Sequence, residues 1–519
     1  MTAPAAGPGD PAAARPSLRP AVLAWALLAL VFTAPYLRAR LLPPPGTAFV
    51  GAFYFPSDVY NYLGYAQQAQ DGAFLFRNKL TLEPHRPALV NIEWWLVGRT
   101  AALLGGRLLL AWRLLGLGAA LGFVLAADAW LRRAGLPDAH RLPALMLIGL
   151  AGGFGGLLHT LQWPPRLDPI DLSTGLFPLV ELLGNPHFVC GTTLLMAALL
   201  LLLRGGRRAT VAGLALAAVA GLTRPYDMVM VVAVYALTIA VREPFGQWPR
   251  RLLPLLALLP VAGYLGWVFY GHGAYRIFGA DQYRMPPAWM LAVALGPALA
   301  LAVAARPWPA PDAEAARARA ALWCWVGMGI AVVALRPVSF SLQFLAGIGV
   351  PLLALGALGL ARWRPAAILA ALLVLGSTAF VALRVVSADR GAWFAPLPQV
   401  QAAHALAPAC RPGDVVVAPR EIGLYALAFS PCSAYVSHPV MRDAAVRAQQ
   451  VAAFYTQWNP ALRSLFLDAT GARAVVLPVD DGAVPASWLG PATPFRRVSA
   501  GPGFAIYARA AAAAPAAAP

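Results

Sequence analysis

Charged side chains are scarce in this chain. Asp, Glu, Lys and Arg make up 12% of its 519 residues, whereas 60% of the residues are hydrophobic, and the mean hydropathy is +0.64. An ordinary soluble domain has about twice that share of charged residues. The shortage excludes a soluble enzyme of ordinary composition and favours a chain whose solvent is the lipid bilayer.

Cysteine and lysine are also rare. Four cysteines are too few for a disulfide scaffold. Cys190 and Cys324 lie in apolar runs, where a thiol behaves as a small hydrophobic group. Cys410 and Cys432 lie in the polar C-terminal part. Lys79 is the one lysine, and this bias, together with the abundance of Ala, Gly and Pro, is typical of a GC-rich bacterial genome.

Two further observations limit the functional classes. The chain has no G-x-G-x-x-G and no P-loop, so nothing indicates nucleotide binding. The formal net charge is +18, but the basic residues are spread between apolar runs and do not cluster on one soluble face. Membrane topology therefore explains them better than nucleic-acid binding does.

Apolar segments of a length suited to crossing about 30 Å of hydrocarbon recur through residues 20–384. They fall at roughly 20–37, 108–130, 143–159, 187–203, 209–223, 226–241, 252–270, 287–305, 321–335, 344–361 and 366–384. The sequence thus predicts an α-helical polytopic membrane protein with about eleven transmembrane helices. The first segment resembles a signal sequence but has no small-x-small cleavage site, so we interpret it as an uncleaved helix after a disordered cytoplasmic tail at 1–19.

The arginines in the short connections predict the orientation. One side carries Arg15, Arg19, Arg132, Arg133, Arg141, Arg204, Arg207, Arg208, Arg242, Arg250, Arg251, Arg306, Arg317, Arg319, Arg362 and Arg364. The other side carries Arg166, Arg224, Arg276, Arg284 and Arg336. Because cytoplasmic loops are enriched in basic residues, we expect a cytoplasmic N-terminus in a bacterial inner (cytoplasmic) membrane. With an odd number of helices, the loop at 38–107 and the region after about 385 then lie outside.

That placement predicts a disulfide between Cys410 and Cys432, because the compartment outside the membrane is oxidising. The region 385–508 itself reads as a small α/β domain. We expect helices near 398–408, 441–457 and 459–470 and strands at DVVVA, AYVS, RAVVLP and GFAIYAR. The Ala- and Pro-rich residues 509–519 are predicted to be a disordered tail.

Two outer loops are too patterned to be simple connectors. In the loop at 38–107, PSDVYNYLGYAQQAQDG predicts a helix with Asp58 in its first turn and a stop at Gly72. VNIEWWLVGRTAALLGG has the composition of a helix in the membrane interface. The loop HTLQWPPRLDPIDLSTGLFPLVELLGNPH adds the acidic residues Asp168, Asp171 and Glu181. We expect any chemistry on this outer face.

The order of these parts resembles the GT-C superfamily of membrane glycosyltransferases, such as the protein O-mannosyltransferases and the lipid A aminoarabinose transferase. One helix precedes a structured outer loop with an acidic residue at the start of a helix, and further helices and an extracytoplasmic domain follow. The residues that carry the resemblance are FPSDVYNYLGYAQQAQDG and, more loosely, GNPHFVCG and LTRPYD. The chain differs from the O-mannosyltransferases in that Val59 replaces the second acid of their Asp-Glu pair.

The resemblance implies a transferase that moves a sugar from a polyprenyl-phosphate carrier to a glycan, lipid or protein acceptor outside the membrane, with inversion. Asp58 would then be the catalytic base or help to bind a divalent metal. Outer arginines and a helix-start histidine would bind the lipid phosphate and the substrate; these candidates are Arg224, Arg276, Arg284, Arg336 and His187. No nucleic-acid partner is expected.

Each candidate also has a plainer interpretation. Asp58 and His187 are placed where residues simply start helices. The outer arginines are placed where interfacial anchors lie, and the spacing of Asp168, Asp171 and Glu181 is not diagnostic of a metal site. For the whole protein, the alternatives are a transporter or lipid flippase without chemistry and a non-catalytic envelope assembly protein. Against transport, Arg113 and Asp128 are the main ionisable residues within a predicted span, and no internal repeat is evident.

Overall fold

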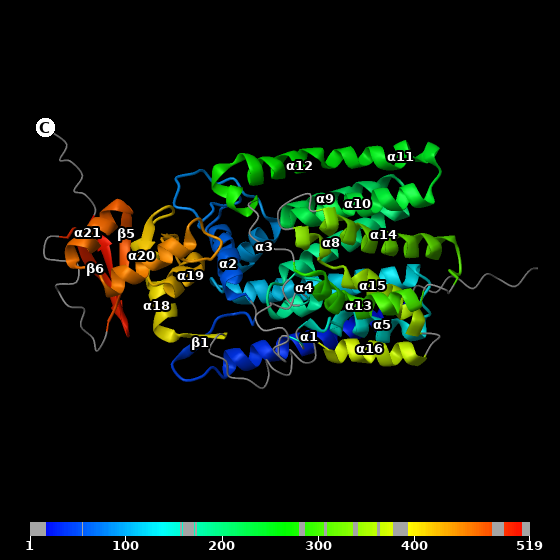
Figure 1. Cartoon of the computed structure of the whole chain (residues 1–519), viewed down its shortest axis with the longest axis horizontal. Coiled ribbons are helices and arrows are strands. Elements are labelled where there is room, and N and C mark those ends of the chain that lie inside the picture. Colours follow the sequence, from blue (N-terminus) through cyan, green and yellow to red (C-terminus); the bar gives the residue numbers. More distant parts are fainter. Residues whose placement is uncertain are drawn as a thin grey trace, which may run out of the picture.

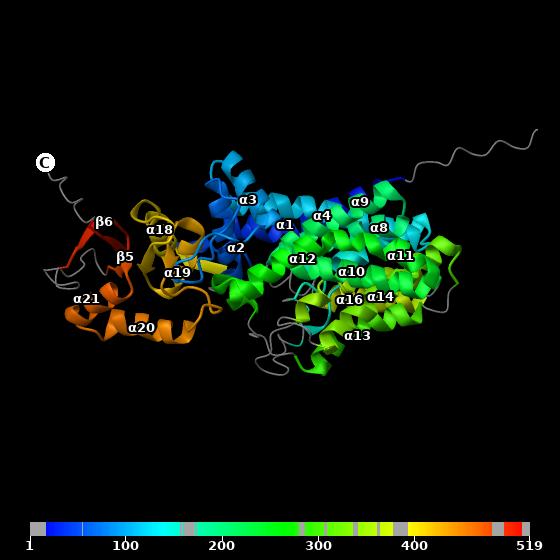
Figure 2. The ribbon, with the colours of Figure 1, turned by 90° about the horizontal axis from the view of Figure 1, so that it is seen from above.

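The computed structural model describes residues 17–53, 55–155, 158, 171, 174–279, 286–305, 309–335, 341–360, 364–376, 393–479 and 493–510. The molecule is elongated, with a bundle of long helices at one end and a small α/β domain at the other (Figure 1). Helices α2 (Pro56–Gln70) and α3 (Ile92–Leu103) lie between them. The view from above shows the same order along the long axis (Figure 2). The predicted tails at 1–19 and 509–519 lie almost wholly outside the described residues.

The bundle is built from helices of both long and short span. They are α1 (Arg19–Leu41), α4 (Leu108–Arg133), α5 (Arg141–Leu150), α8 (His187–Arg204), α9 (Arg207–Thr223), α10 (Pro225–Arg242), α11 (Trp248–Leu252), α12 (Leu259–Gly266), α13 (Ala288–Ala304), α14 (Ala313–Leu335), α15 (Gly349–Leu360) and α16 (Arg364–Gly376). Short 3-10 turns include η2 (Pro178–Leu183), η6 (Gly273–Gly279) and η7 (Ser341–Leu345).

Seven described helical segments are long and apolar enough to cross a membrane: Arg19–Leu41, Leu108–Arg133, His187–Arg204, Pro225–Arg242, Phe245–Gly271, Ala313–Leu335 and Ser341–Gly359. The predicted number of eleven is not confirmed. Four predicted spans, at 143–159, 209–223, 287–305 and 366–384, are not among these segments. The helices α5, α9 and α13 have 10, 17 and 17 residues, fewer than the roughly 20 residues that a span requires. The fourth predicted span contains α16 and continues into residues outside the described part. The chain is therefore a largely helical, membrane-embedded protein.

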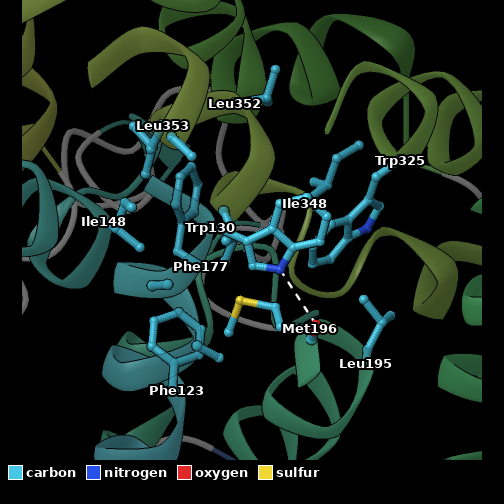
Figure 3. Close-up of a cluster of buried hydrophobic side chains, with 14 of the residues drawn as sticks. Phe123, Trp130, Ile148, Phe177, Leu195, Met196, Trp325, Ile348, Leu352 and Leu353 are labelled. Carbon is cyan, nitrogen blue, oxygen red and sulfur yellow. Dashed lines mark hydrogen bonds between the residues drawn. The ribbon is translucent and has the colours of Figure 1, made fainter. Parts of the chain in front are cut away.

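The bundle has an apolar interior packed around large aromatic side chains. Trp130 and Trp325 are almost fully buried, and Figure 3 shows them beside Phe123, Met196 and Ile348. The indole N–H of Trp130 donates to the carbonyl oxygen of Met196 at 3.4 Å, so its polar edge is satisfied inside the core. Aliphatic side chains that remain exposed, such as those of α1 and α11–α12, are the side chains that lipid would cover.

One end of the bundle collects arginines and their ionic partners. Asp128, near the end of α4, accepts two hydrogen bonds from Arg141 at 2.7 and 2.6 Å, and Arg132 pairs with it at 3.2 Å. This end is opposite to the C-terminal domain (Figure 1). Hydrogen bonds and ion pairs with arginines near the end of α4 therefore account for the buried Asp128 carboxylate.

Arg113, near the start of α4 at the other end of the bundle, also has partners within the protein. Its guanidinium donates to the carbonyl oxygens of Leu182 at 2.8 Å and of Gly51, and it lies over the ring of Tyr36. The Arg113 side chain therefore connects the segment at Gly51 to η2. Neither of the two ionisable residues that the sequence placed within spans is left without a partner.

The C-terminal domain contains a five-stranded sheet with strand order β4-β3-β5-β7-β6. Strands β3 (Val415–Val417), β4 (Ser433–Ala434) and β5 (Ala472–Pro478) are parallel, while β6 (Phe495–Gly501) and β7 (Phe504–Arg509) are antiparallel. The helices are α18 (Leu397–Ala405), α19 (Arg420–Phe429), α20 (Ala444–Thr456) and α21 (Pro460–Ala469). The sequence analysis missed α19 and β6. The structure joins Cys410 and Cys432, whose Cα atoms are 5.7 Å apart.

The C-terminal domain makes several contacts with the segment 38–107, two of them through its backbone. Strand β1 (Thr47–Phe49) pairs antiparallel with β2 (Phe394–Pro396). Helix α2 packs against α19 so closely that a Cβ at Gly64 would lie 2.7 Å from the carbonyl oxygen of Leu427. This contact places the first turn of α2 against the loop that follows β4.

Candidate functional site

Asp58 lies in the first turn of α2, where the sequence analysis expected it. The residue before the helix, Phe55, has φ +46°, a left-handed conformation that bulky residues rarely adopt. Such strain is maintained only where the surroundings hold it, and it is found preferentially at functional sites. The Asp58 side chain is 30% exposed, so its carboxylate is accessible as well as held in place.

The partner of Asp58 comes from the C-terminal domain. Nε2 of His438 lies 2.8 Å from Oδ1 of Asp58, although 380 residues separate them in the chain. His438 is 3% exposed. Its other ring nitrogen, Nδ1, accepts a hydrogen bond from the backbone N–H of Val440 at 3.1 Å. Because Nδ1 is an acceptor, the ring hydrogen is on Nε2, and Nε2–H donates a hydrogen bond to the Asp58 carboxylate.

Aromatic rings lie one turn beyond Asp58 on the same helix. Tyr62 stacks on Trp94 of α3 with ring centroids 4.8 Å apart. His187, at the start of α8, meets the Tyr62 ring edge-on at 4.9 Å. His187 is 8% exposed, and its Nδ1 has no hydrogen-bond partner among the described residues. The structure thus brings the predicted candidates Asp58 and His187 to neighbouring positions, linked by Tyr62.

Glu93 of α3 is a buried acid that the sequence analysis did not select for the site. It is 5% exposed, and neither carboxylate oxygen has a hydrogen-bond partner within the described residues. Burial raises the pKa of Glu93 to about 8, opposed by the nearby Trp112 indole, the Cys190 thiol and the positive charge of Arg224. At neutral pH this carboxyl is mostly protonated and is able to donate as well as accept a hydrogen bond.

Glu181, one of the acidic candidates predicted from the sequence, lies in η2 and is 1% exposed. Its Oε1 accepts a hydrogen bond from the backbone N–H of Gly175 at 2.9 Å. Burial raises the pKa of Glu181 to about 8; the Gly175 N–H and Arg224 act in the opposite direction, and the charge of Asp58 adds to the rise. Glu181 is therefore electrostatically coupled to both Asp58 and Arg224.

Arg224, placed between α9 and α10, is 5% exposed and is already engaged. It donates to Asp227 at 3.2 Å and to Gln343 of η7 at 3.0 Å, and it lies 4.4 Å over the ring of Phe188. A Cβ at Gly191 would overlap the Asp227 carboxylate, so only glycine lets α8 approach this ion pair. Asp227 neutralises much of the charge that the sequence analysis assigned to a phosphate site.

The other predicted residues are distributed differently. Arg276 is exposed on η6, and Asp171 is fully buried. Arg284, Arg336 and Asp168 lie outside the described residues. No group of three or more His, Cys, Asp or Glu side chains in the described part of the chain is arranged to hold a metal ion.

The accessible Asp58 carboxylate lies near the buried acid Glu181, whose pKa its charge helps to raise. Asp58 is able to accept a proton from a hydroxyl group, because its environment keeps one face of the helix start open. Tyr62 and Trp94 stack on each other and Trp94 is 3% exposed, so this pair contributes packing to the site. His438, Glu93 and Gln343 were missed because their relation to Asp58 or Arg224 depends on contacts between distant segments.

No protein-family model matches this chain, and no curated protein matches it.

Proposed function

We propose that the chain is a glycosyltransferase of GT-C type that moves a sugar from a polyprenyl-phosphate carrier to an acceptor outside a bacterial inner membrane. The observation that carries the proposal is the accessible Asp58 carboxylate, held by His438 where the helical bundle meets the C-terminal domain. A membrane-anchored donor holds its reactive carbon near the headgroup plane. A base at the membrane-facing junction of a soluble domain suits that geometry.

The chemistry is a single displacement. The acceptor hydroxyl attacks the anomeric carbon while Asp58 takes its proton, the bond between that carbon and the phosphate oxygen breaks, and polyprenyl phosphate leaves with the electron pair. One in-line step inverts the anomeric centre. Arg276, Arg284 and Arg336 are proposed ligands of the departing phosphate, and Arg224 contributes only the part of its positive potential that Asp227 leaves uncompensated. A divalent metal remains part of the proposal only as an auxiliary to Asp58.

The test is a transfer assay with Asp58→Asn, using the purified protein in lipid nanodiscs and a panel of polyprenyl-phosphate sugars. The amide keeps an oxygen that accepts the hydrogen bond of His438 but cannot take up a proton. Loss of a general base is expected to lower turnover by about 10²- to 10⁴-fold, whereas weakening an exposed helix start costs only about 1 kcal/mol of stability.

Glu83→Gln is the matched control, because Glu83 also meets the C-terminal domain through an ion pair with Arg442, at 3.4 Å, and both side chains are exposed. An exposed pair contributes little, so this variant should keep wild-type turnover. A folded Asp58→Asn protein with nearly full turnover would show that Asp58 only starts the helix. Substrate movement across the bilayer without any release of polyprenyl phosphate would instead identify a flippase.

A further inference from the structure

The loop that follows β4 presents His438 to α2 in one fixed orientation. The backbone N–H of Val440 donates to its Nδ1 at 3.1 Å, and the Met441 N–H donates to the His438 carbonyl oxygen at 3.1 Å. Rotation of the ring by half a turn would place a carbon where Val440 now finds an acceptor. The imidazole is therefore locked with Nε2–H directed at Asp58.

Neighbouring contacts hold this loop independently of Asp58. The side chain of Arg420 at the start of α19 donates to the Ser437 carbonyl oxygen at 3.5 Å, and the Tyr435 N–H donates to the Val416 carbonyl oxygen at 2.8 Å. Gly423 leaves no room for a Cβ against the Val436 carbonyl. The position of His438 is thus determined by the fold of the C-terminal domain and not by its partner on α2.

Only one oxygen of Asp58 is used in this contact. Oδ1 accepts the hydrogen bond from Nε2–H of His438, and no other hydrogen bond to the Asp58 side chain is found among the described residues. The side chain is still 30% exposed. The hydrogen bond therefore fixes the carboxylate rotamer and leaves Oδ2 available to an incoming group.

We propose that His438 is a positioning residue for Asp58, so that the C-terminal domain completes the site of the membrane domain. This inference rests on the proposed transferase function for its kinetic consequence, but the pairing itself does not. Misplacement of a reacting group by about 1 Å costs roughly 10²-fold in rate. His438→Ala is accordingly expected to lower kcat by about 10- to 100-fold with little change in KM for the lipid donor.

Domain docking should survive this substitution, because other contacts hold the interface. Lys79 donates to the Leu427 carbonyl oxygen, and β1 pairs with β2. His438→Gln is the conservative variant, since its amide N–H reaches the place of Nε2, and it should recover much of the lost kcat. A purely structural His438 would give the opposite pattern: lower thermal stability in both variants, with unchanged kcat per folded molecule.

A second measurement tests the pairing without any assay of transfer. The chain has seven histidines, so ¹⁵N-histidine labelling gives few signals, and the signal lost in His438→Gln identifies His438. We expect the tautomer protonated on Nε2, with the Nε2–H proton shifted and exchanging faster in Asp58→Ala. A proton on Nδ1, or a spectrum unchanged by Asp58→Ala, would overturn the inference.

The two measurements separate the two claims. A wild-type protein that turns over none of the polyprenyl-phosphate sugars would end the proposed function, while the ¹⁵N spectrum would still decide the pairing. An active enzyme whose kcat is unaffected by His438→Ala would remove the positioning role and leave the proposed transferase function standing.

Discussion

Nζ of Lys79, in the segment between α1 and α4, donates a hydrogen bond to the carbonyl oxygen of Leu427 at 2.7 Å, across 348 residues of chain. It also donates to the carbonyl oxygen of Ser430. Both carbonyls lie at the C-terminal end of α19, where a positive charge is favourable. The one lysine of the chain thus attaches the C-terminal domain to the loop that carries Asp58.

The buried Lys79 side chain is expected to make the stability of the protein depend on pH. Burial lowers its pKa to about 7, with Asp71 opposing the change; the unfolded value is about 10.4. Between these values the unfolded chain binds more protons, so the Lys79 contribution to the free energy of unfolding rises with pH. Lys79→Met should remove this rise and leave two carbonyls unpaired, at a cost of about 1–3 kcal/mol.

The measurement is the melting temperature of wild type and variant from pH 7 to 9.5. Arg86→Met is the control, because Arg86 is an exposed basic residue of the same loop. The difference between wild type and Lys79→Met should widen as pH increases, whereas that for Arg86→Met should stay constant. Parallel curves for Lys79→Met would mean that Lys79 stays charged throughout this range.

The buried Glu93 carboxyl group is expected to give the opposite dependence of stability on pH. Its pKa in the folded protein is about 8 and about 4.3 when unfolded, so the folded state binds more protons between these values. The contribution of Glu93 to the free energy of unfolding is therefore fully present below pH about 4. It is lost as pH rises through about 8, at a limiting slope of roughly 1.4 kcal/mol per pH unit. Glu93→Gln does not titrate.

We expect Glu93→Gln to match the wild-type melting temperature near pH 5 and to exceed it increasingly toward pH 8.5. Glu83→Gln, which changes an exposed carboxylate, should show no such divergence. If the gain of Glu93→Gln is the same at every pH, the carboxylate is ionised in the folded protein and must have a partner that neutralises it.

The features that the sequence was able to predict are local ones. The helix at Asp58, the helix α3 and the α/β character of the last domain followed from local patterns, since caps, periodicity and composition are local. The short helix α5 was predicted as a span because hydropathy does not reveal where a helix ends. The backbone partners of Lys79, His438 as partner of Asp58 and Gln343 as partner of Arg224 could not be predicted, because each belongs to a segment more than one hundred residues away.

The disulfide gives a prediction about the C-terminal domain alone. Cys410 and Cys432 close a loop with a sequence separation of 22, which corresponds to roughly 3 kcal/mol of stabilisation from a restricted unfolded state. The double variant Cys410→Ser, Cys432→Ser should lower the melting temperature and increase proteolysis of this domain. Cys324→Ala, which alters a buried free thiol, should leave proteolysis of the domain unchanged. Equal proteolysis of the double variant would contradict a stabilising bridge.

The last prediction concerns the orientation of the molecule in the membrane. Helix α9 begins at Arg207 and ends at Thr223, whose carbonyl oxygen accepts a hydrogen bond from Asn91 beside α3. At about 1.5 Å per residue, its 17 residues separate the arginine-rich end of the bundle from Asn91 and α3 by roughly 25 Å, and α3 lies on the side of the C-terminal domain (Figure 1). Because cytoplasmic loops collect arginine, the arginine-rich end should be cytoplasmic and the C-terminal domain extracytoplasmic.

Introduced cysteines at two exposed positions, Arg208→Cys and Arg442→Cys, test this orientation with a membrane-impermeant maleimide on intact spheroplasts. The native Cys190 and Cys324 are free, so an unmodified protein measures the background. Arg442→Cys should label before permeabilisation and Arg208→Cys only after it. The reverse result would put Asp58 and His438 on the cytoplasmic side. The site would then face the wrong compartment for an acceptor outside the cell, and the proposed transferase reaction would have to be abandoned even if the Asp58–His438 hydrogen bond were present.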